Sequence, residues 1–112
     1  MAEGSYYGKD HLAEFPARIT RANKDLAGRF FEYYGSVMGP GALTEREKAL
    51  IGLAVSHAVQ CPYCIETYTK SCLAKGADAS QMTEAVHVAA AVSAGSVLVH
   101  GMQMFDRVEK SG

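Results

Sequence analysis

The fold of this chain is decided by residues 44–76, TEREKALIGLAVSHAVQCPYCIETYTKSCLAKG. Thr44 and Glu47 open this stretch at the capping-box spacing, in which a hydroxyl and a carboxylate satisfy each other's free backbone amides at a helix start. A mostly apolar segment without Asp, Glu, Lys or Arg follows over residues 49–65. The pattern predicts a helix over residues 44–59.

A second helix is predicted to begin in the same stretch, at Cys61-Pro62. Proline suits the first helical position because its missing amide hydrogen would have no partner there in any case. The helix is expected to end at Lys75-Gly76, because a cation in the last turn complements the helix dipole and glycine adopts the conformation that ends a helix.

Further helices are predicted outside this stretch, and no sustained alternation of apolar and polar residues indicates a strand. The fold class is therefore all-α: a compact helical bundle, in one domain that spans residues 1–112. Gly39-Pro40-Gly41 is expected to end the first of these helices, and Ser80 is expected to cap the second. The predicted ranges are 22–35, about 81–94, and a last helix that follows Gly95 to about Glu109.

The overall charge argues against nucleic acid as a partner. The chain has 11 basic and 12 acidic residues, a net charge of −1, and no basic stripe with interleaved aromatic residues. Its first ten residues include Lys9 and Asp10, where a signal peptide would need an apolar run. We therefore expect a cytoplasmic protein that binds no nucleic acid.

Two regions, 44–59 and 81–109, are apolar around most of the helix circumference. Such helices need burial, and one chain of 112 residues has little core in which to bury both. We expect part of this surface to contact other copies of the chain in a homo-oligomer, with a tight monomeric bundle as the alternative. Residues 85–105 have the length of a membrane span, but their histidines, serines and glycines would be costly in hydrocarbon, so no membrane partner is expected.

The chemistry is predicted to lie in the pair Cys61 and Cys64, at the start of the second helix. Unpaired amides and the positive end of the helix dipole stabilise an anion there, so a thiolate forms more readily. Two intervening residues allow a disulfide to close within the first turn, which thiol–disulfide chemistry requires. The alternatives are a site for a soft ion such as zinc or arsenite, with Cys72 as a further ligand, and cysteines that only pack inside a helical assembly module.

Two neighbours of the pair are candidates for proton transfer and hydrogen bonding. His57 lies four residues before Cys61, one helical turn back, where an imidazole can take a proton from a thiol. Tyr68 lies four residues after Cys64, where its hydroxyl can donate a hydrogen bond to a sulfur or a sulfenate. Core packing is the alternative interpretation of both side chains. The predicted catalytic set is Cys61, Cys64, His57 and Tyr68.

The order of these parts resembles the carboxymuconolactone decarboxylase and alkylhydroperoxidase D family. The resemblance implies an alkylhydroperoxidase D-like helical fold, assembled as homotrimers or homohexamers, whose cysteine pair reduces hydroperoxides or disulfides with no cofactor and no metal. A thiol reductant, either a protein or a small thiol, would re-reduce the pair. Decarboxylation is not implied, because the decarboxylase members lack the cysteine pair. The resemblance covers about residues 40–105 and rests on segment 43–56, Cys61-Pro62-Tyr63-Cys64, Gly76, and Glu84-Ala85 before an alanine- and valine-rich run.

Three segments are similar to a narrower subgroup of that family, described as arsenosugar-biosynthesis-associated and peroxidase-like. They are residues 57–64, 86–90 and 98–101. This similarity implies an arsenic-handling context rather than a particular reaction.

The proton relay of the family's peroxidases has no counterpart at the matching positions. The glutamate expected twelve residues before the first cysteine is Ala49, and the histidine expected four residues after the second is Tyr68. The histidine often found just before the second cysteine is Tyr63. We therefore expect weak peroxidase activity with His57 as the base, or with His87 of a neighbouring helix in its place.

Overall fold

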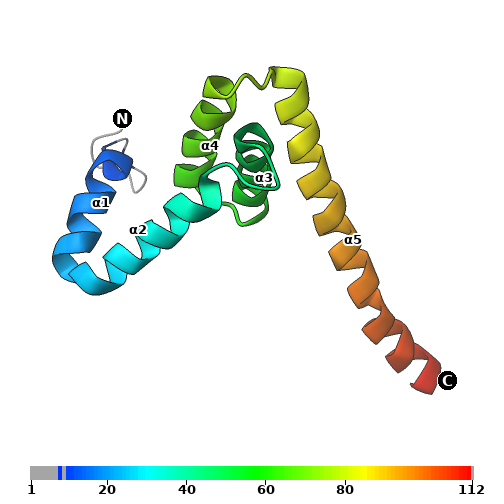
Figure 1. The fold of residues 1–112 in the computed structure, drawn as a ribbon. Coiled ribbons are helices and arrows are strands. Elements are labelled where there is room, and N and C mark those ends of the chain that lie inside the picture. The colour runs from blue at the N-terminus through cyan, green and yellow to red at the C-terminus, as the bar shows by residue number, and fades with distance from the viewer. Residues whose placement is uncertain (1–7, 9, 112) are drawn as a thin grey trace.

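The chain folds into five helices in the computed structural model, which describes Gly8 and residues 10–111. No strand occurs in this described part, so the all-α prediction is confirmed. Figure 1 shows α3 and α4 side by side at the centre, with the α1–α2 pair on one side and α5 on the other. In chain order the helices are α1 (His11–Ala22), α2 (Lys24–Met38), α3 (Glu45–Ala58), α4 (Pro62–Ala74) and α5 (Ala79–Ser111).

The predicted capping box at the start of α3 is present. The Glu47 amide donates to Thr44 Oγ1 at 3.1 Å, and the Thr44 amide donates to Glu47 Oε1 at 2.8 Å. The hydrogen bonds from Thr44 hold the pKa of the Glu47 carboxyl below its usual value, because they favour the charged form. Helix α3 therefore begins where the sequence predicts.

Helix α1 was not predicted. It packs against α2 through Phe15 and Phe31, whose rings meet edge to face with centroids 5.8 Å apart. Asn23 separates the two helices, and its Oδ1 accepts the amide of Leu26 at 3.1 Å. This N-cap starts α2 at Lys24 rather than at the predicted residue 22.

Helix α5 corrects two predictions. It runs unbroken through Gly95, because an isolated glycine costs a helix only about 1 kcal/mol and no left-handed residue or proline stops the chain there. Its start is capped by Asp78 rather than by Ser80. Asp78 Oδ1 accepts the Gln81 amide at 2.8 Å, and the Asp78 amide donates to Gln81 Oε1 at 3.0 Å.

The core lies where α3 meets α4 and the start of α5. Its buried members are Ala49 and Leu53 from α3, Cys72 from α4, and Ala77 from the connection to α5. Leu50, Tyr68, Met82 and Val86 pack against them.

The chain is elongated because α5 extends beyond the other helices (Figure 1). The radius of gyration is 18.6 Å, compared with about 13 Å for a compact domain of this length. The accessible surface is 8603 Å², whereas a compact monomer of this mass exposes about 6,000 Å². The expected burial of the helix over residues 81–109 is therefore not found within a single chain.

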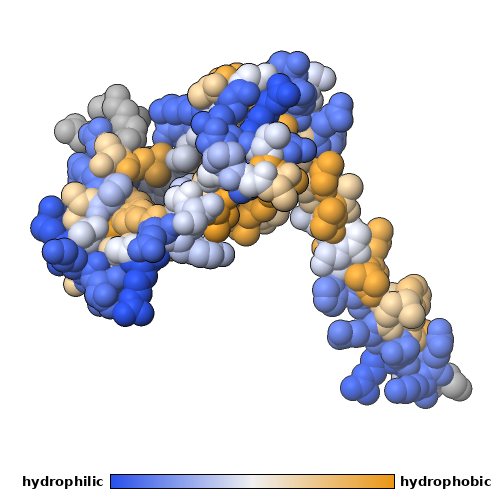
Figure 2. Space-filling view, viewed as in Figure 1, coloured by the Kyte–Doolittle hydropathy of each residue, from blue (hydrophilic) through white to orange (hydrophobic). Residues whose placement is uncertain are grey.

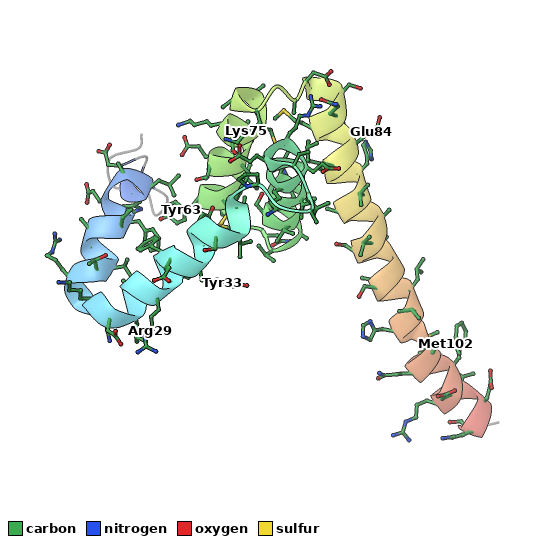
Figure 3. The ribbon with its side chains drawn as sticks, viewed as in Figure 1. Arg29, Tyr33, Tyr63, Lys75, Glu84 and Met102 are labelled. Atoms are coloured by element: carbon green, nitrogen blue, oxygen red, sulfur yellow. A yellow bond between two sulfur atoms is a disulfide. The ribbon has the colours of Figure 1, made fainter. Side chains whose placement is uncertain are left out.

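The distal part of α5 exposes an apolar surface. Val97 is 73% exposed and Leu98 is 77% exposed. Figure 2 shows hydrophobic side chains along α5, and Figure 3 places Met102 far from every other helix drawn. By length and composition alone α5 is long and apolar enough to cross a membrane, a test that core helices of soluble proteins also pass.

Candidate functional site

The end of α3 places Cys61 by a backbone turn. The Cys61 amide donates to the Ser56 carbonyl at 3.0 Å, and the Gln60 amide donates to the His57 carbonyl at 3.1 Å. These two bonds form a Schellman motif, which requires a left-handed residue between them. Gln60 takes that conformation with φ of 56°, a position that usually belongs to glycine. The turn delivers Cys61 directly to the start of α4.

Cys61 is the N-cap of α4 and is joined to Cys64 by a disulfide. The two Cα atoms are 5.2 Å apart, and Pro62 occupies the first helical turn as predicted. Cys61 Sγ also accepts the Cys64 amide at 3.2 Å. An anionic sulfur at Cys61 would therefore receive a backbone hydrogen bond and the positive end of the helix dipole.

The disulfide borders two cavities. The first, of about 580 Å³, lies between α2, α3 and α4 and is lined by Cys64, Ser56, Tyr68 and mostly apolar side chains. The second, of about 540 Å³, lies between α1 and the start of α4 and is lined by both Cys61 and Cys64. Cys64 is therefore reached from two sides and Cys61 from one.

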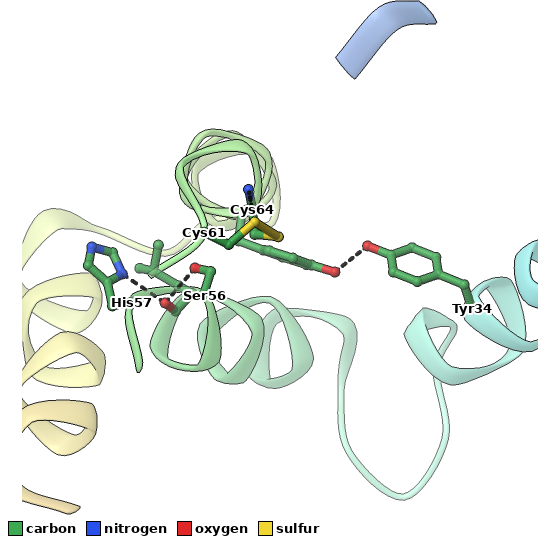
Figure 4. Close-up of a disulfide and its surroundings, with 7 residues drawn as sticks. Tyr34, Ser56, His57, Cys61 and Cys64 are labelled. Atoms are coloured by element: carbon green, nitrogen blue, oxygen red, sulfur yellow. Dashed lines mark hydrogen bonds between the residues drawn. A yellow bond between two sulfur atoms is a disulfide. The ribbon is translucent and has the colours of Figure 1, made fainter. Parts of the chain in front are cut away.

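Tyr68 lies in the first cavity and is held on two sides. Its ring covers Gly52, where an added Cβ would lie 2.6 Å from Tyr68 Cδ1. Its hydroxyl is hydrogen-bonded to the hydroxyl of Tyr34 (Figure 4). Burial, together with this bond, raises the pKa of Tyr68 well above its usual value of 10, so the phenol stays neutral. Tyr68 therefore suits hydrogen bonding and not proton abstraction.

The side chain of His57 points away from the disulfide, which lies at the start of α4. Figure 4 shows its ring on the side toward α5, with Ser56 between it and the disulfide. His57 Nδ1 donates to the Leu53 carbonyl of its own helix at 2.8 Å, which leaves Nε2 for other partners. Its ring lines neither cavity beside the disulfide. The structure thus brings together Cys61, Cys64 and Tyr68, and His57 as base stays a prediction.

Lys48 lines the first cavity and binds the end of α2. Its Nζ donates to the Val37 carbonyl at 2.7 Å and to the Gly39 carbonyl at 2.6 Å. Val37 is in the last turn of α2 and Gly39 directly follows the helix, where a helix leaves its acceptors unpaired and carries partial negative charge. Lys48, which is on α3, therefore holds the end of α2 against α3 on the side where both helices line the cavity.

The family model of the carboxymuconolactone decarboxylase family matches residues 24–107, which include both cysteines, the whole of α2, α3 and α4, and most of α5. This chain belongs to the carboxymuconolactone decarboxylase family. The family includes decarboxylases and alkylhydroperoxidases.

Two relatives support this membership. "Uncharacterized protein 4 in cox locus" from Paracoccus denitrificans is 40% identical over 81 residues, which are 72% of this chain and 73% of that protein. A crystal structure of a protein from Methanobacterium thermoautotrophicum, from the Northeast Structural Genomics Consortium, is 33% identical with a TM-score of 0.74. The match covers 78% of this chain and 98% of that one. Neither description mentions arsenic, so the arsenosugar subgroup stays a prediction.

Helix α1 lies outside the part of the chain that matches the carboxymuconolactone decarboxylase family, and it brings residues to the site that sequence reasoning missed. His11 Nδ1 is hydrogen-bonded to the Tyr63 hydroxyl at 2.7 Å, and the centroids of the two rings are 5.7 Å apart. Both residues line the second cavity with the sulfurs. No local pattern signals this contact, because 52 residues separate its members.

Cys72 lies in the core and not beside the pair. It is a free thiol with no exposed surface, and burial raises its pKa. In Gly8 and residues 10–111 no three His, Cys, Asp or Glu side chains are grouped so that they could hold a metal ion. Cys61, Cys64 and Cys72, the ligand set considered from the sequence for a soft ion, are therefore not brought together in this structure.

Proposed function

We propose that this family member is a peroxidase-like thiol–disulfide oxidoreductase in which Cys61 and Cys64 cycle between two thiols and a disulfide. One observation carries the proposal: the pair closes a disulfide at the N-terminus of α4 and borders two cavities. A helix start stabilises the thiolate that the reaction needs, and the cavities provide access for an oxidant and a reductant.

The reaction balances with a hydroperoxide as oxidant. A thiolate of the pair attacks the terminal peroxide oxygen, so that an S–O bond forms, the O–O bond breaks and the alcohol leaves with one proton. The sulfur of the other cysteine then attacks the sulfenic acid, so that the S–S bond forms and the S–O bond breaks. The hydroxide that is displaced takes the proton of this second thiol and leaves as water. Two electrons pass from the thiols to the peroxide, and a thiol reductant returns two electrons and two protons to the disulfide.

Neighbouring side chains are assigned supporting roles. Tyr68 shares the first cavity with Cys64, and its neutral hydroxyl is suited to donate a hydrogen bond to a sulfenate there. His57 is the base proposed from sequence spacing, and His87 is its alternative. A thiol protein or small thiol is the proposed reductant, in the cytoplasm and in an arsenic-handling context.

We propose assembly into a homotrimer or homohexamer through α5. The single chain exposes about 2,600 Å² more than a compact monomer of its mass, from 8603 Å² and an expected value of about 6,000 Å². That excess in one chain is large enough for obligate interfaces, which bury about 2,000 to 5,000 Å² counted over both partners. Light scattering should therefore give several times the chain mass of 12.0 kDa, and a monomer at micromolar concentration would contradict the proposal.

Thiol counting tests the proposed chemistry. The fully reduced, metal-free protein should lose two thiols and form an internal disulfide when one equivalent of hydrogen peroxide is added. Cys61→Ser and Cys64→Ser should form no such disulfide, and Cys72→Ser should react like the parent. Retention of all three thiols, with stoichiometric binding of arsenite or zinc, would instead support the soft-ion alternative.

A further inference from the structure

Helix α1 forms one wall of the site, and this helix lies outside the residues that match the family. The match begins at residue 24, whereas α1 spans His11–Ala22. The cavity that α1 forms with α4 is the one of the two that reaches both sulfurs. Leu12, Phe15 and Ile19 make the α1 side of this cavity largely apolar, so few polar groups there can exchange a proton with the sulfurs.

His11 is the imidazole in this cavity, and Tyr63 fixes its orientation. The hydrogen bond between His11 Nδ1 and the Tyr63 hydroxyl is 2.7 Å long, and the rings are in contact. Figure 3 shows Tyr63 at the end of α4 that faces α1. Because Tyr63 lies between Cys61 and Cys64 in the chain, it links the histidine to the cysteine turn itself.

The cysteine pair needs a proton acceptor that its nearer neighbours do not provide. Ala49 has no titratable group, and the raised pKa of Tyr68 makes its phenolate inaccessible at neutral pH. His57 uses Nδ1 within its own helix and lines neither cavity. His11 is the histidine that lines a cavity with both sulfurs.

We propose that His11 is the acid–base residue of the Cys61–Cys64 pair and that Tyr63 is its positioning residue, an inference that rests on the proposed function. His11 takes the proton of the attacking thiol and returns one proton to the alkoxide that leaves when the O–O bond breaks. The imidazole therefore ends the first step in its starting state, and the electron balance is unchanged.

The surroundings of His11 set the expected pH dependence. The charged and titratable groups that line the cavity with it are Arg18 of α1 and the cysteines and Tyr63 of α4. Arg18 is also paired with Glu14 at 3.4 Å, and both are largely exposed. An acid–base residue acts in a different protonation state in each half of the step, so we expect the reactivity of the pair to show a pH inflection that is lost when His11 is replaced.

The test uses the full chain, reduced, with His11→Ala and His11→Gln as paired variants. Both should slow peroxide-driven thiol loss by about tenfold or more, since positioned acid–base groups typically contribute about 10²- to 10⁴-fold. Added imidazole should restore part of the rate to His11→Ala. Tyr63→Phe should slow the reaction less and displace the inflection, because the imidazole remains but loses its partner. His100→Ala is the matched control, since this exposed residue is hydrogen-bonded to the Ser96 carbonyl of its own helix and lines neither cavity beside the disulfide, and it should react like the parent.

Alkylation by iodoacetamide as a function of pH gives a readout that does not depend on peroxide turnover. The parent should show the inflection, and both His11 variants should lack it. If the parent reduces no peroxide but this difference is found, the proposed function fails and the coupling of His11 to the pair stands. If the His11 variants match the parent in both assays, or if His57→Ala alone removes the inflection, the inference is wrong. Slower variants with an unchanged pH profile and no rescue by imidazole would also overturn it, since they would show a merely structural role.

Discussion

Substituting Gly52 by alanine is expected to displace Tyr68 from its place beside the cysteine pair. The new Cβ would lie 2.6 Å from Tyr68 Cδ1, 2.7 Å from Cε1 and 3.1 Å from Cγ. All three atoms belong to one rigid ring whose hydroxyl is also fixed by Tyr34. The ring therefore has to move as a unit, and both its packing on α3 and its hydrogen bond are disturbed.

The magnitude follows from two opposing contributions. Overpacking of this kind lowers the free energy of unfolding by about 1–3 kcal/mol, whereas alanine in a helix interior is favoured over glycine by about 1 kcal/mol. The net loss for Gly52→Ala is about 1 kcal/mol, or roughly 4–8 °C in Tm for a small domain. The control is Gly28→Ala on α2, where an added Cβ meets nothing within 4 Å. This variant should gain up to about 1 kcal/mol.

Urea unfolding of the variants at one protein concentration measures both effects, because assembly would make stability depend on concentration. The decisive comparison is Gly52→Ala in a Tyr68→Ala background, where the obstructing ring is absent. There the substitution should become stabilising, by up to about 1 kcal/mol. The reasoning is refuted if Gly52→Ala stabilises the parent as Gly28→Ala does, or if its cost persists without the Tyr68 ring.

Three further predictions follow from the site. Gln60→Gly should raise the free energy of unfolding by up to about 1 kcal/mol in urea, because glycine adopts a positive φ without steric cost, and Gln60→Val should lower it. A thiol reagent should find no reactive cysteine in the oxidised native protein and one after unfolding, since Cys72 is buried; a reactive native thiol would contradict this. Because the folded pKa of Tyr68 is raised, its contribution to stability is complete below about pH 10 and is lost above it, so Tyr68→Phe should flatten the alkaline loss of stability.

The sequence predicts best what contacts within about four residues determine. The capping box of Thr44 and Glu47 and the start of α4 at Pro62 need only neighbouring residues, and both are found. The cap of α5 is ambiguous in the sequence, because Asp78 and Ser80 are both capping residues, and the structure shows that Asp78 caps the helix with Gln81 as its partner. The break expected at Gly95 failed because a penalty of about 1 kcal/mol does not stop a helix by itself.

The candidate site is less predictable because its contacts join distant residues. Gly52 and Tyr68 are 16 positions apart, Tyr34 and Tyr68 are 34 apart, and His11 and Tyr63 are 52 apart. Helical spacing correctly placed Tyr68 with Cys64, since both are on α4. The same four-residue spacing does not place His57 beside Cys61, because the two residues are not on one helix. Gln60, which is left-handed, lies between them where α3 ends and the chain changes direction.

Two turns of the same kind show what the conformation of Gln60 achieves. At the end of α4 the chain makes a second Schellman motif, in which the Ala77 amide donates to the Cys72 carbonyl at 2.9 Å and Gly76 has φ of 85°. Glycine takes that position without steric cost, whereas an ordinary L-residue there costs about 1–2 kcal/mol. The strained version is the one directly before the cysteine pair, and it leads the chain from the last turn of α3 to the N-cap of α4 within three residues. Strain that persists beside a candidate site indicates that the surrounding structure fixes the position of the first sulfur.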